Sequence, residues 1–143
     1  MAEIFHSFTV NAPLSNVFEG ISTPKGLDTL WTKSSAGIPG LHEIYKLDFG
    51  PHYIWSGIVS KYVADKEFEL QITDAQPDWI NTKVGFVLNN KIEVTEVHFY
   101  HKGWPQNNEH YRISSYCWAM YLRILKRYLE YGEQVSYENR LNV

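Results

Sequence analysis

The sequence has little of several features that would restrict its class. It contains one cysteine, Cys117, which excludes an intrachain disulfide and fits a reducing compartment. The formal net charge is −3, and the densest basic segment holds only Arg123, Lys126 and Arg127, so the footprint of a nucleic-acid-binding protein is missing. No stretch approaches the ~18 apolar residues of a membrane span, and MAEIFHSFTV at the start lacks the pattern of a signal peptide. We therefore expect a cytoplasmic protein without a nucleic-acid partner.

Motifs for catalysis or cofactors are also missing. The sequence has no HExxH metal motif, no glycine-rich phosphate loop and no GxSxG elbow. His98 and His101 are spaced like a metal pair, but a separation of three on a strand places their side chains on opposite faces. Cys117 has no recognisable base, and Glu67 and Glu69 are expected to lie on a solvated strand face. We expect no metal, no cofactor and no assignable catalytic residue, and we leave open whether any reaction is catalysed.

Aromatic side chains are abundant instead. They make up 15% of the chain, with ten Tyr, seven Phe and five Trp. Large rings with polar tips favour interfaces and ligand cavities, and a tyrosine-rich core with its hydroxyl groups at the surface is the alternative. The excess is greatest between Ser114 and Gly132, where Tyr116, Tyr121 and Tyr128 lie beside or opposite a regular apolar stripe.

Hydrophobic periodicity predicts the first half of the fold. An alternating strand over residues 4–10 is followed by two short helices, one from Pro13 to Ile21 and one from Pro24 to Trp31. Residues 34–40 are expected to form a loop. Segments of period two then predict five antiparallel strands near 41–49, 53–63, 67–73, 80–89 and 92–102, with Asn89 and Asn90 at the last hairpin turn.

A long helix follows the strands. Asn107 or Asn108 can cap it, Gly132 can end it, and its stripe contains Tyr111, Ser115, Trp118, Leu122, Leu125 and Leu129. Together the elements predict one α+β domain over residues 1–133, with a six-stranded curved antiparallel sheet around this C-terminal helix, and a loose tail over residues 134–143.

Three stretches of this chain resemble a known family. These are LWT at Leu30 to Thr32, TEVHFYHKGW at Thr95 to Trp104, and CWAMYLRILKRYLEYG at Cys117 to Gly132, with a weaker likeness in WSGIVSKY. The order of elements resembles the helix-grip fold of the START/SRPBCC superfamily, and the chain is similar to its group named after activators of the heat-shock chaperone ATPase. The resemblance implies a cavity that takes lipids or small hydrophobic molecules; a few members catalyse aromatic cyclisation, and eukaryotic relatives stimulate a chaperone.

Strand alternation predicts which side chains face the helix. The inward set contains three residues from each of the five strands: Tyr45, Leu47, Phe49; Trp55, Gly57, Val59; Phe68, Leu70, Ile72; Val84, Phe86, Leu88; Val97, Phe99, His101. From these residues and the helices we predict a ligand pocket formed by Trp31, Tyr45, Trp55, Phe86, Phe99, His101, Tyr111, Ser115 and Trp118. A solid core built from the same residues is the alternative, and a measured cavity volume separates the two.

Three functions remain open at this stage. The first is binding of a hydrophobic, lipid-like or aromatic small molecule between the last helix and the sheet. The second is an enzyme of the cyclase or hydrolase type, with His101 or a tyrosine as proton donor. The third is an interaction module that contacts a chaperone or forms a homodimer through exposed aromatics such as Tyr116, Tyr131 and Trp79.

Overall fold

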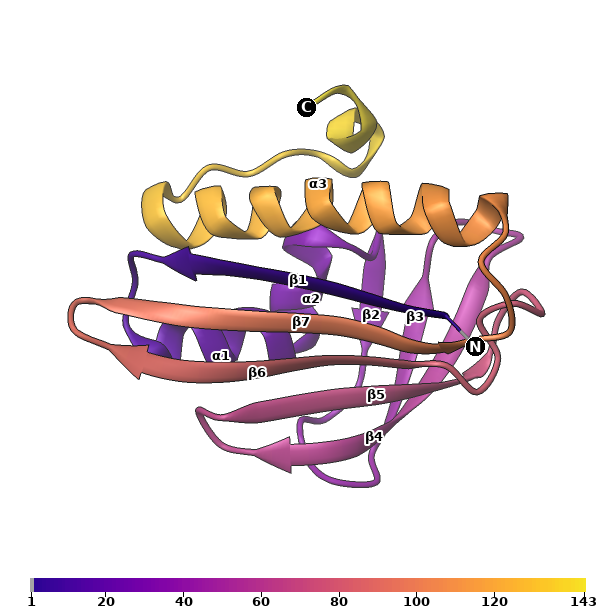
Figure 1. Cartoon of the computed structure of the whole chain (residues 1–143), viewed down its shortest axis with the longest axis horizontal. Helices are drawn as coiled ribbons and strands as arrows, with labels where there is room; N and C mark the ends of the chain where they lie inside the picture. Colours follow the sequence, from indigo (N-terminus) through magenta and orange to yellow (C-terminus); the bar gives the residue numbers. More distant parts are fainter. Residues whose placement is uncertain (1) are drawn as a thin grey trace.

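The computed structural model describes residues 2–143 and places a long helix against one face of an antiparallel sheet (Figure 1). The strands are β1 (Ala2–Val10), β2 (Ser34–Ala36), β3 (Ile44–Asp48), β4 (Ile54–Val63), β5 (Glu67–Asp74), β6 (Lys83–Lys91) and β7 (Val94–Trp104). The helices are α1 (Leu14–Ser22), α2 (Pro24–Leu30), α3 (Glu109–Tyr131) and the 3-10 helix η1 (Tyr137–Asn142). The predicted α+β class and the order of the main elements are confirmed.

The sheet has seven strands in the order β1-β7-β6-β5-β4-β3-β2, so the expected number of six is wrong. The additional strand is β2, where a loop over residues 34–40 was expected. Its three residues pair with the end of β3, from Ser34 opposite Asp48 to Ala36 opposite Lys46. A strand this short carries no readable alternation, and it forms because β3 offers an unpaired edge.

The register of β6 and β7 corrects the predicted hairpin turn. Lys91 pairs with Val94, so the turn consists of Ile92 and Glu93, three positions further along the chain than the expected Asn89–Asn90 pair. Glu93 has a φ of 65°, the left-handed conformation that such a tight turn demands. The core sets this register, because it places Phe86 opposite Phe99 on the inward face of the sheet.

The predicted inward set is confirmed by burial. Most of its members are less than 4% exposed, and Phe49 and Trp55 at the open end of the sheet are partly buried. His98 lies on the outer face, where Ser7 and Glu96 contact its ring, while His101 is fully buried. The two histidines therefore lie on opposite faces, as their spacing predicts.

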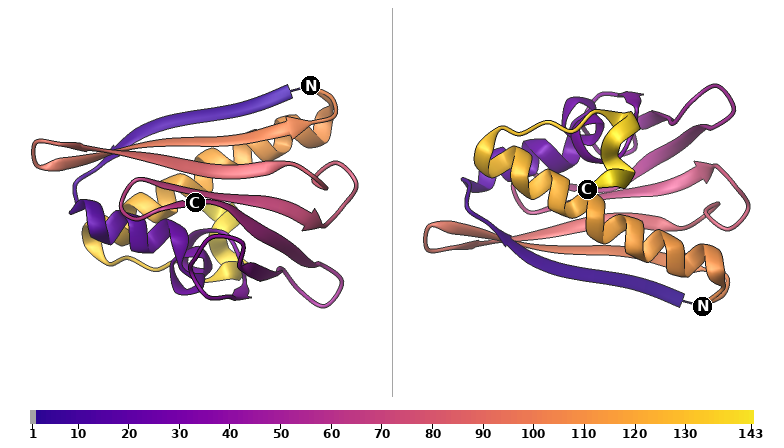
Figure 2. Two further views of the ribbon diagram at one scale, coloured as in Figure 1. Left: turned by 90° about the horizontal axis from the view of Figure 1, so that it is seen from below. Right: turned by 90° about the horizontal axis from the view of Figure 1, so that it is seen from above.

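Helix α3 runs diagonally across the strands (Figure 2). Asn108 caps it by accepting a hydrogen bond from the Tyr111 amide at 2.9 Å, and Gly132 ends it with a φ of 70°. Trp118, Leu122 and Leu125 of the predicted stripe are at most 3% exposed. The helix is therefore held at both ends and packed along the middle.

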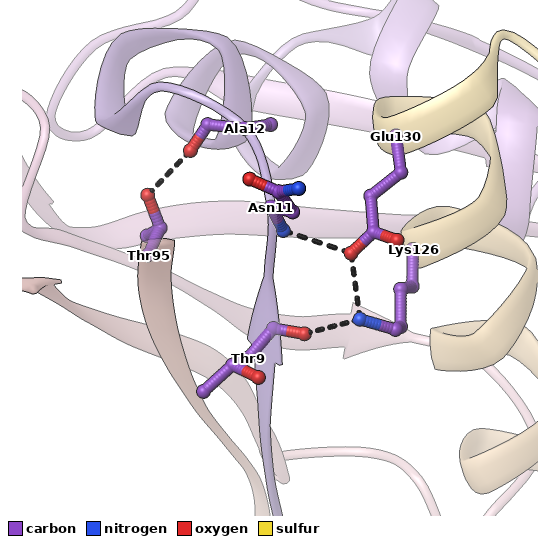
Figure 3. A network of polar contacts seen from close by, with 6 residues as sticks. All are labelled: Thr9, Asn11, Ala12, Thr95, Lys126 and Glu130. Carbon is purple, nitrogen blue, oxygen red and sulfur yellow. Dashed lines mark hydrogen bonds and ion pairs between the residues drawn. The ribbon is translucent and has the colours of Figure 1, made fainter. Parts of the chain in front are cut away.

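A polar network fastens the C-terminal half of α3 to the end of β1 (Figure 3). Lys126 donates to the Thr9 carbonyl at 2.7 Å and lies 2.6 Å from a Glu130 carboxylate oxygen. The same oxygen accepts from the Asn11 amide at 2.8 Å, and these two donors hold the pKa of Glu130 below its ordinary value. These contacts hold the C-terminal half of α3 against the end of β1.

On the outer face, Glu69 is buried, so the expectation of a solvated side chain is wrong. Its carboxylate accepts hydrogen bonds from the hydroxyl groups of Tyr100 and Ser60, and it is 3% exposed. Tyr100 reaches it from two strands away by lying across Gly85, where a Cβ atom would come within 2.3 Å of the tyrosine oxygen. Alternation predicts the correct face for Glu69 but not the ring that covers it.

Residues 133–143, which we call the arm, return along α3 and end in η1 (Figure 1). The expectation of a loose tail is wrong here, because Arg140 is only 4% exposed. Its guanidinium donates to the carbonyl oxygens of Asp28 and Thr32, the latter at 3.1 Å. These carbonyls lie at the C-terminal end of α2, where helices leave oxygen atoms without partners and favour a cation.

Candidate functional site

All five tryptophans of the chain meet in one aromatic cluster. Trp79, from the loop between β5 and β6, is its centre, with ring centroids 5.1 Å from Trp55, 5.7 Å from Trp104, and 6.2 Å from both Trp31 and Trp118. Trp79 is 6% exposed, so its predicted role as an exposed interaction residue is wrong. The cluster joins the sheet, α2 and α3 into one rigid aromatic wall.

His101 lies in the core and connects two tryptophans of this wall through hydrogen bonds. Its Nδ1 accepts a hydrogen bond from the indole N–H of Trp118 at 3.1 Å, and its Nε2 donates to the Thr82 hydroxyl at 2.8 Å. That hydroxyl donates in turn to the Trp79 carbonyl at 2.6 Å. Burial and the nearby His110 lower the pKa of His101 to about 3, so the ring is neutral at pH 7.

The junction between the middle of α3 and the sheet is filled. The ring of Trp118 lies 4.6 Å from that of Phe99, and the gap that remains between Trp118, Phe86 and neighbouring side chains measures about 10 Å³. A gap of this size holds one water molecule at most and no organic ligand. The predicted ligand cavity does not occupy this part of the junction.

An open groove of about 360 Å³ lies at the other end of the cluster. We call it the aromatic groove, and its lining residues are Trp31, Phe49, Tyr53, Trp55, Gln76, Trp79, His110, Ile113, Ser114, Cys117, Trp118, Tyr121 and Tyr137. They come from the end of α2, the β3–β4 loop, the start of β4, the β5–β6 loop, the first half of α3 and the arm. This volume is within the range of small-molecule sites, and a predominantly aromatic lining with a few polar groups is typical of them.

The groove carries few charged side chains. His110 Nδ1 lies 3.1 Å from an Asp78 carboxylate oxygen at the rim, and this contact, with a second from Asn108, lowers the pKa of Asp78. Burial raises the pKa of the Cys117 thiol and raises that of Tyr121 to about 12, so both are neutral at pH 7. The lining therefore suits an uncharged apolar molecule oriented by a few polar tips.

The structure brings together three of the nine predicted site residues. Trp31, Trp55 and Trp118 line the aromatic groove. Phe86 and Phe99 belong to the filled junction, while the Tyr45 hydroxyl donates to the Ser22 carbonyl at 2.6 Å.

The other three lie away from the groove. His101 supports Trp118 from the core. The Tyr111 hydroxyl donates to the Glu3 carbonyl at 2.5 Å, and the Ser115 carbonyl contacts His6 at 3.2 Å.

Several groove residues escaped the sequence prediction of the site. Trp79 and Gln76 lie in a loop, where neither period two nor period 3.6 assigns a direction to a side chain. Tyr137 lies beyond the last predicted helix. Phe49 and Tyr121 carried a usable signal, since one is in the predicted inward set and the other is among the surplus tyrosines of the helix.

Two other hollows are larger but differ in character. One of about 400 Å³ lies between β1 and α3 and includes Ser7, Thr9, Arg123 and Lys126. Another of about 550 Å³ lies between α1, α2 and the end of α3, with a polar lining that includes Glu19 and Lys25. We favour the aromatic groove because burial of apolar ligand surface needs an apolar wall.

The remaining features concern metal ions and membranes. Residues 2–143 contain no group of three or more His, Cys, Asp or Glu side chains arranged to hold a metal ion. None of the helices in the same range has the length and apolar character needed to cross a bilayer.

Comparisons with known proteins give a family and several structural neighbours. A family model described as Activator of Hsp90 ATPase homolog 1-like protein matches residues 11–130. The solution structure of the Aha1 dimer from Colwellia psychrerythraea is 25% identical, with a TM-score of 0.84 over 93% of this chain and 99% of that one.

Two further structures are more distant in sequence. A crystal structure of a Staphylococcus saprophyticus protein is 17% identical, with a TM-score of 0.77 over 94% and 96% of the two chains. The solution structure of CalU16 from Micromonospora echinospora is 14% identical, with a TM-score of 0.73 over 92% of this chain and 67% of that one. These two support the fold alone. Curated proteins gave no match.

Proposed function

Because this chain belongs to the family of Activator of Hsp90 ATPase homolog 1-like proteins, we propose that it binds a small hydrophobic molecule in its aromatic groove. The family membership confirms the resemblance drawn from the sequence. The observation that supports binding is the groove itself, an open space of about 360 Å³ walled by four of the five tryptophans. The single cysteine favours a cytoplasmic location for this activity.

The favoured ligand is a flat aromatic or lipid-like molecule that covers the tryptophan rings. Burial of ~200 Å² of its apolar surface would contribute about 5 kcal/mol before the costs of association. Weak binding of many apolar compounds is therefore expected from burial alone. A physiological ligand would show a strong preference for one chemical class.

A metabolite panel measured by calorimetry tests this proposal. We expect one class, such as fatty acids or polycyclic aromatic compounds, to bind at least tenfold more tightly than the others. Cys117→Trp introduces a bulky ring into the groove and should abolish that binding. Ala119→Trp is the matched control, because Ala119 is two residues away on α3 and lines the hollow beside β1. Loss of binding in Ala119→Trp alone would move the site to that hollow, and silence across the panel would refute the proposal.

The enzyme hypothesis needs a proton donor other than His101. That residue is fully buried, neutral at pH 7 and engaged at both ring nitrogens, and it does not line the groove. His110 and Tyr137 line the groove and are the candidates for this proton donor. Product analysis after incubation with the tightest ligand separates binding from turnover.

A second candidate function is contact with a chaperone or a second copy of this chain. The neighbour from Colwellia psychrerythraea is described as an Aha1 dimer, and Tyr116 and Tyr131 of α3 are 79% and 73% exposed here. Light scattering over a hundredfold range of concentration measures self-association, and the ATPase rate of a purified Hsp90-type chaperone measures the contact. A monomer at every concentration, together with an unchanged ATPase rate, would count against this candidate.

A further inference from the structure

The arm supplies one side of the aromatic groove. Tyr137 is among the lining residues, and its hydroxyl donates to the Phe49 carbonyl at 3.2 Å. The arm begins after residue 130, where the match to the family model ends. The matched region therefore supplies all the other lining residues of the groove, and a segment outside it supplies Tyr137.

Arg140, rather than apolar burial, holds the far end of the arm to the domain, while Glu133 at its start pairs with Arg127 of α3. The Arg140 guanidinium bonds the carbonyls of Asp28 and Thr32, which flank the groove residue Trp31 in the sequence. Its central carbon lies 5.3 Å from the centre of the Tyr137 ring, within the range of a cation–π contact. In contrast, Leu141 and Val143 are 71% and 66% exposed. A segment with so few buried apolar side chains can detach without unfolding the domain.

We propose that the arm is a coupled part of the ligand site: docking of Tyr137 through Arg140 and occupancy of the aromatic groove stabilise each other. This inference rests on the proposed function. A ligand that contacts Tyr137 binds the docked state more tightly than the undocked state, and it therefore shifts the arm toward the docked state. By linkage, a change that releases the arm lowers the affinity for the ligand by the same factor by which the ligand favours the docked arm. Arg140 acts as a positioning residue, since it does not line the groove and contacts the lining residue Tyr137.

The test uses the full chain with Nile red, a neutral flat dye, as the probe. Arg140→Gln removes the fork that spans the two carbonyls, and Arg140→Lys keeps the charge but not the fork. Arg123→Gln is the control, because Arg123 is an exposed arginine of α3 that lines the hollow beside β1 instead. Dye fluorescence gives the Kd, hydrogen exchange of residues 138–143 reports docking of the arm, and circular dichroism checks the fold.

We expect Arg140→Gln to raise the Kd for Nile red about tenfold, which corresponds to the free energy of one lost aromatic contact. Arg140→Lys should give an intermediate Kd, and Arg123→Gln should leave the Kd unchanged. In the unsubstituted protein, saturating dye should slow exchange in residues 138–143. Equal affinity in Arg140→Gln while its arm exchanges freely would overturn the coupling and leave the proposed function standing. Absence of dye binding to the unsubstituted protein would overturn both.

Discussion

Lowering the pH from 7 to 5 is expected to destabilise the protein through His101. The ordinary pKa of histidine is 6.5, and burial lowers that of His101 to about 3. Below pH 6.5 the unfolded chain takes up a proton at this position, whereas the folded chain stays neutral until about pH 3. The contribution to stability is therefore fully present above pH 6.5 and is lost as the pH falls.

The size of the effect follows from these two pKa values. At pH 5 the unfolded state gains about 2 kcal/mol from protonation of this one side chain, compared with a few tenths at pH 7. A loss of about 2 kcal/mol is a substantial part of the free energy of unfolding of a typical domain, which is roughly 5–15 kcal/mol.

Urea denaturation between pH 5 and pH 7, followed by circular dichroism, measures this effect. His101→Phe should remove most of the slope with pH, and it should cost about 1–3 kcal/mol at pH 7 because the buried Trp118 N–H loses its acceptor. His98→Gln, on the outer face of the same strand, should keep the slope. A flat profile in the unsubstituted protein, or the same slope in His101→Phe, would refute the assignment of a neutral, buried His101.

Three other substitutions test the packing by urea or thermal denaturation. Gly85→Ala places a methyl group against the Tyr100 ring that covers Glu69, so we expect a loss of about 1–3 kcal/mol, and an unchanged midpoint would contradict this contact. Asn108→Ala removes the N-cap of α3 and should cost about 1 kcal/mol, whereas full stability would show that the cap is unimportant. Tyr116→Ala should change stability by less than about 0.5 kcal/mol because the ring is exposed, and a larger loss would mean that something covers it.

Periodicity predicts much of the fold. Alternation assigns Phe86, Phe99 and His101 to the inward face because successive strand residues always point to opposite faces. The same rule places the last hairpin incorrectly. Asn89 and Asn90 have good turn chemistry, but pairing of Phe86 with Phe99 across the core fixes a register in which both asparagines belong to β6 and the turn comes after Lys91.

The candidate site is predicted less well, for a physical reason. A groove forms where elements meet, and its walls include loop residues such as Trp79 and arm residues such as Tyr137. No period constrains the direction of a loop side chain, and only tertiary contacts hold Arg140 in place. Trp31, Trp55 and Trp118 were found because they lie in or beside regular elements.

Nuclear magnetic resonance of the indole N–H groups during a titration with Nile red tests ligand binding in the aromatic groove most directly. We predict saturable shifts in the signals of Trp31, Trp55, Trp79 and Trp118, which line the groove, and the smallest shift in Trp104, which packs behind Trp79. Five unmoved indole signals, or a shift confined to Trp104, would contradict binding at this site.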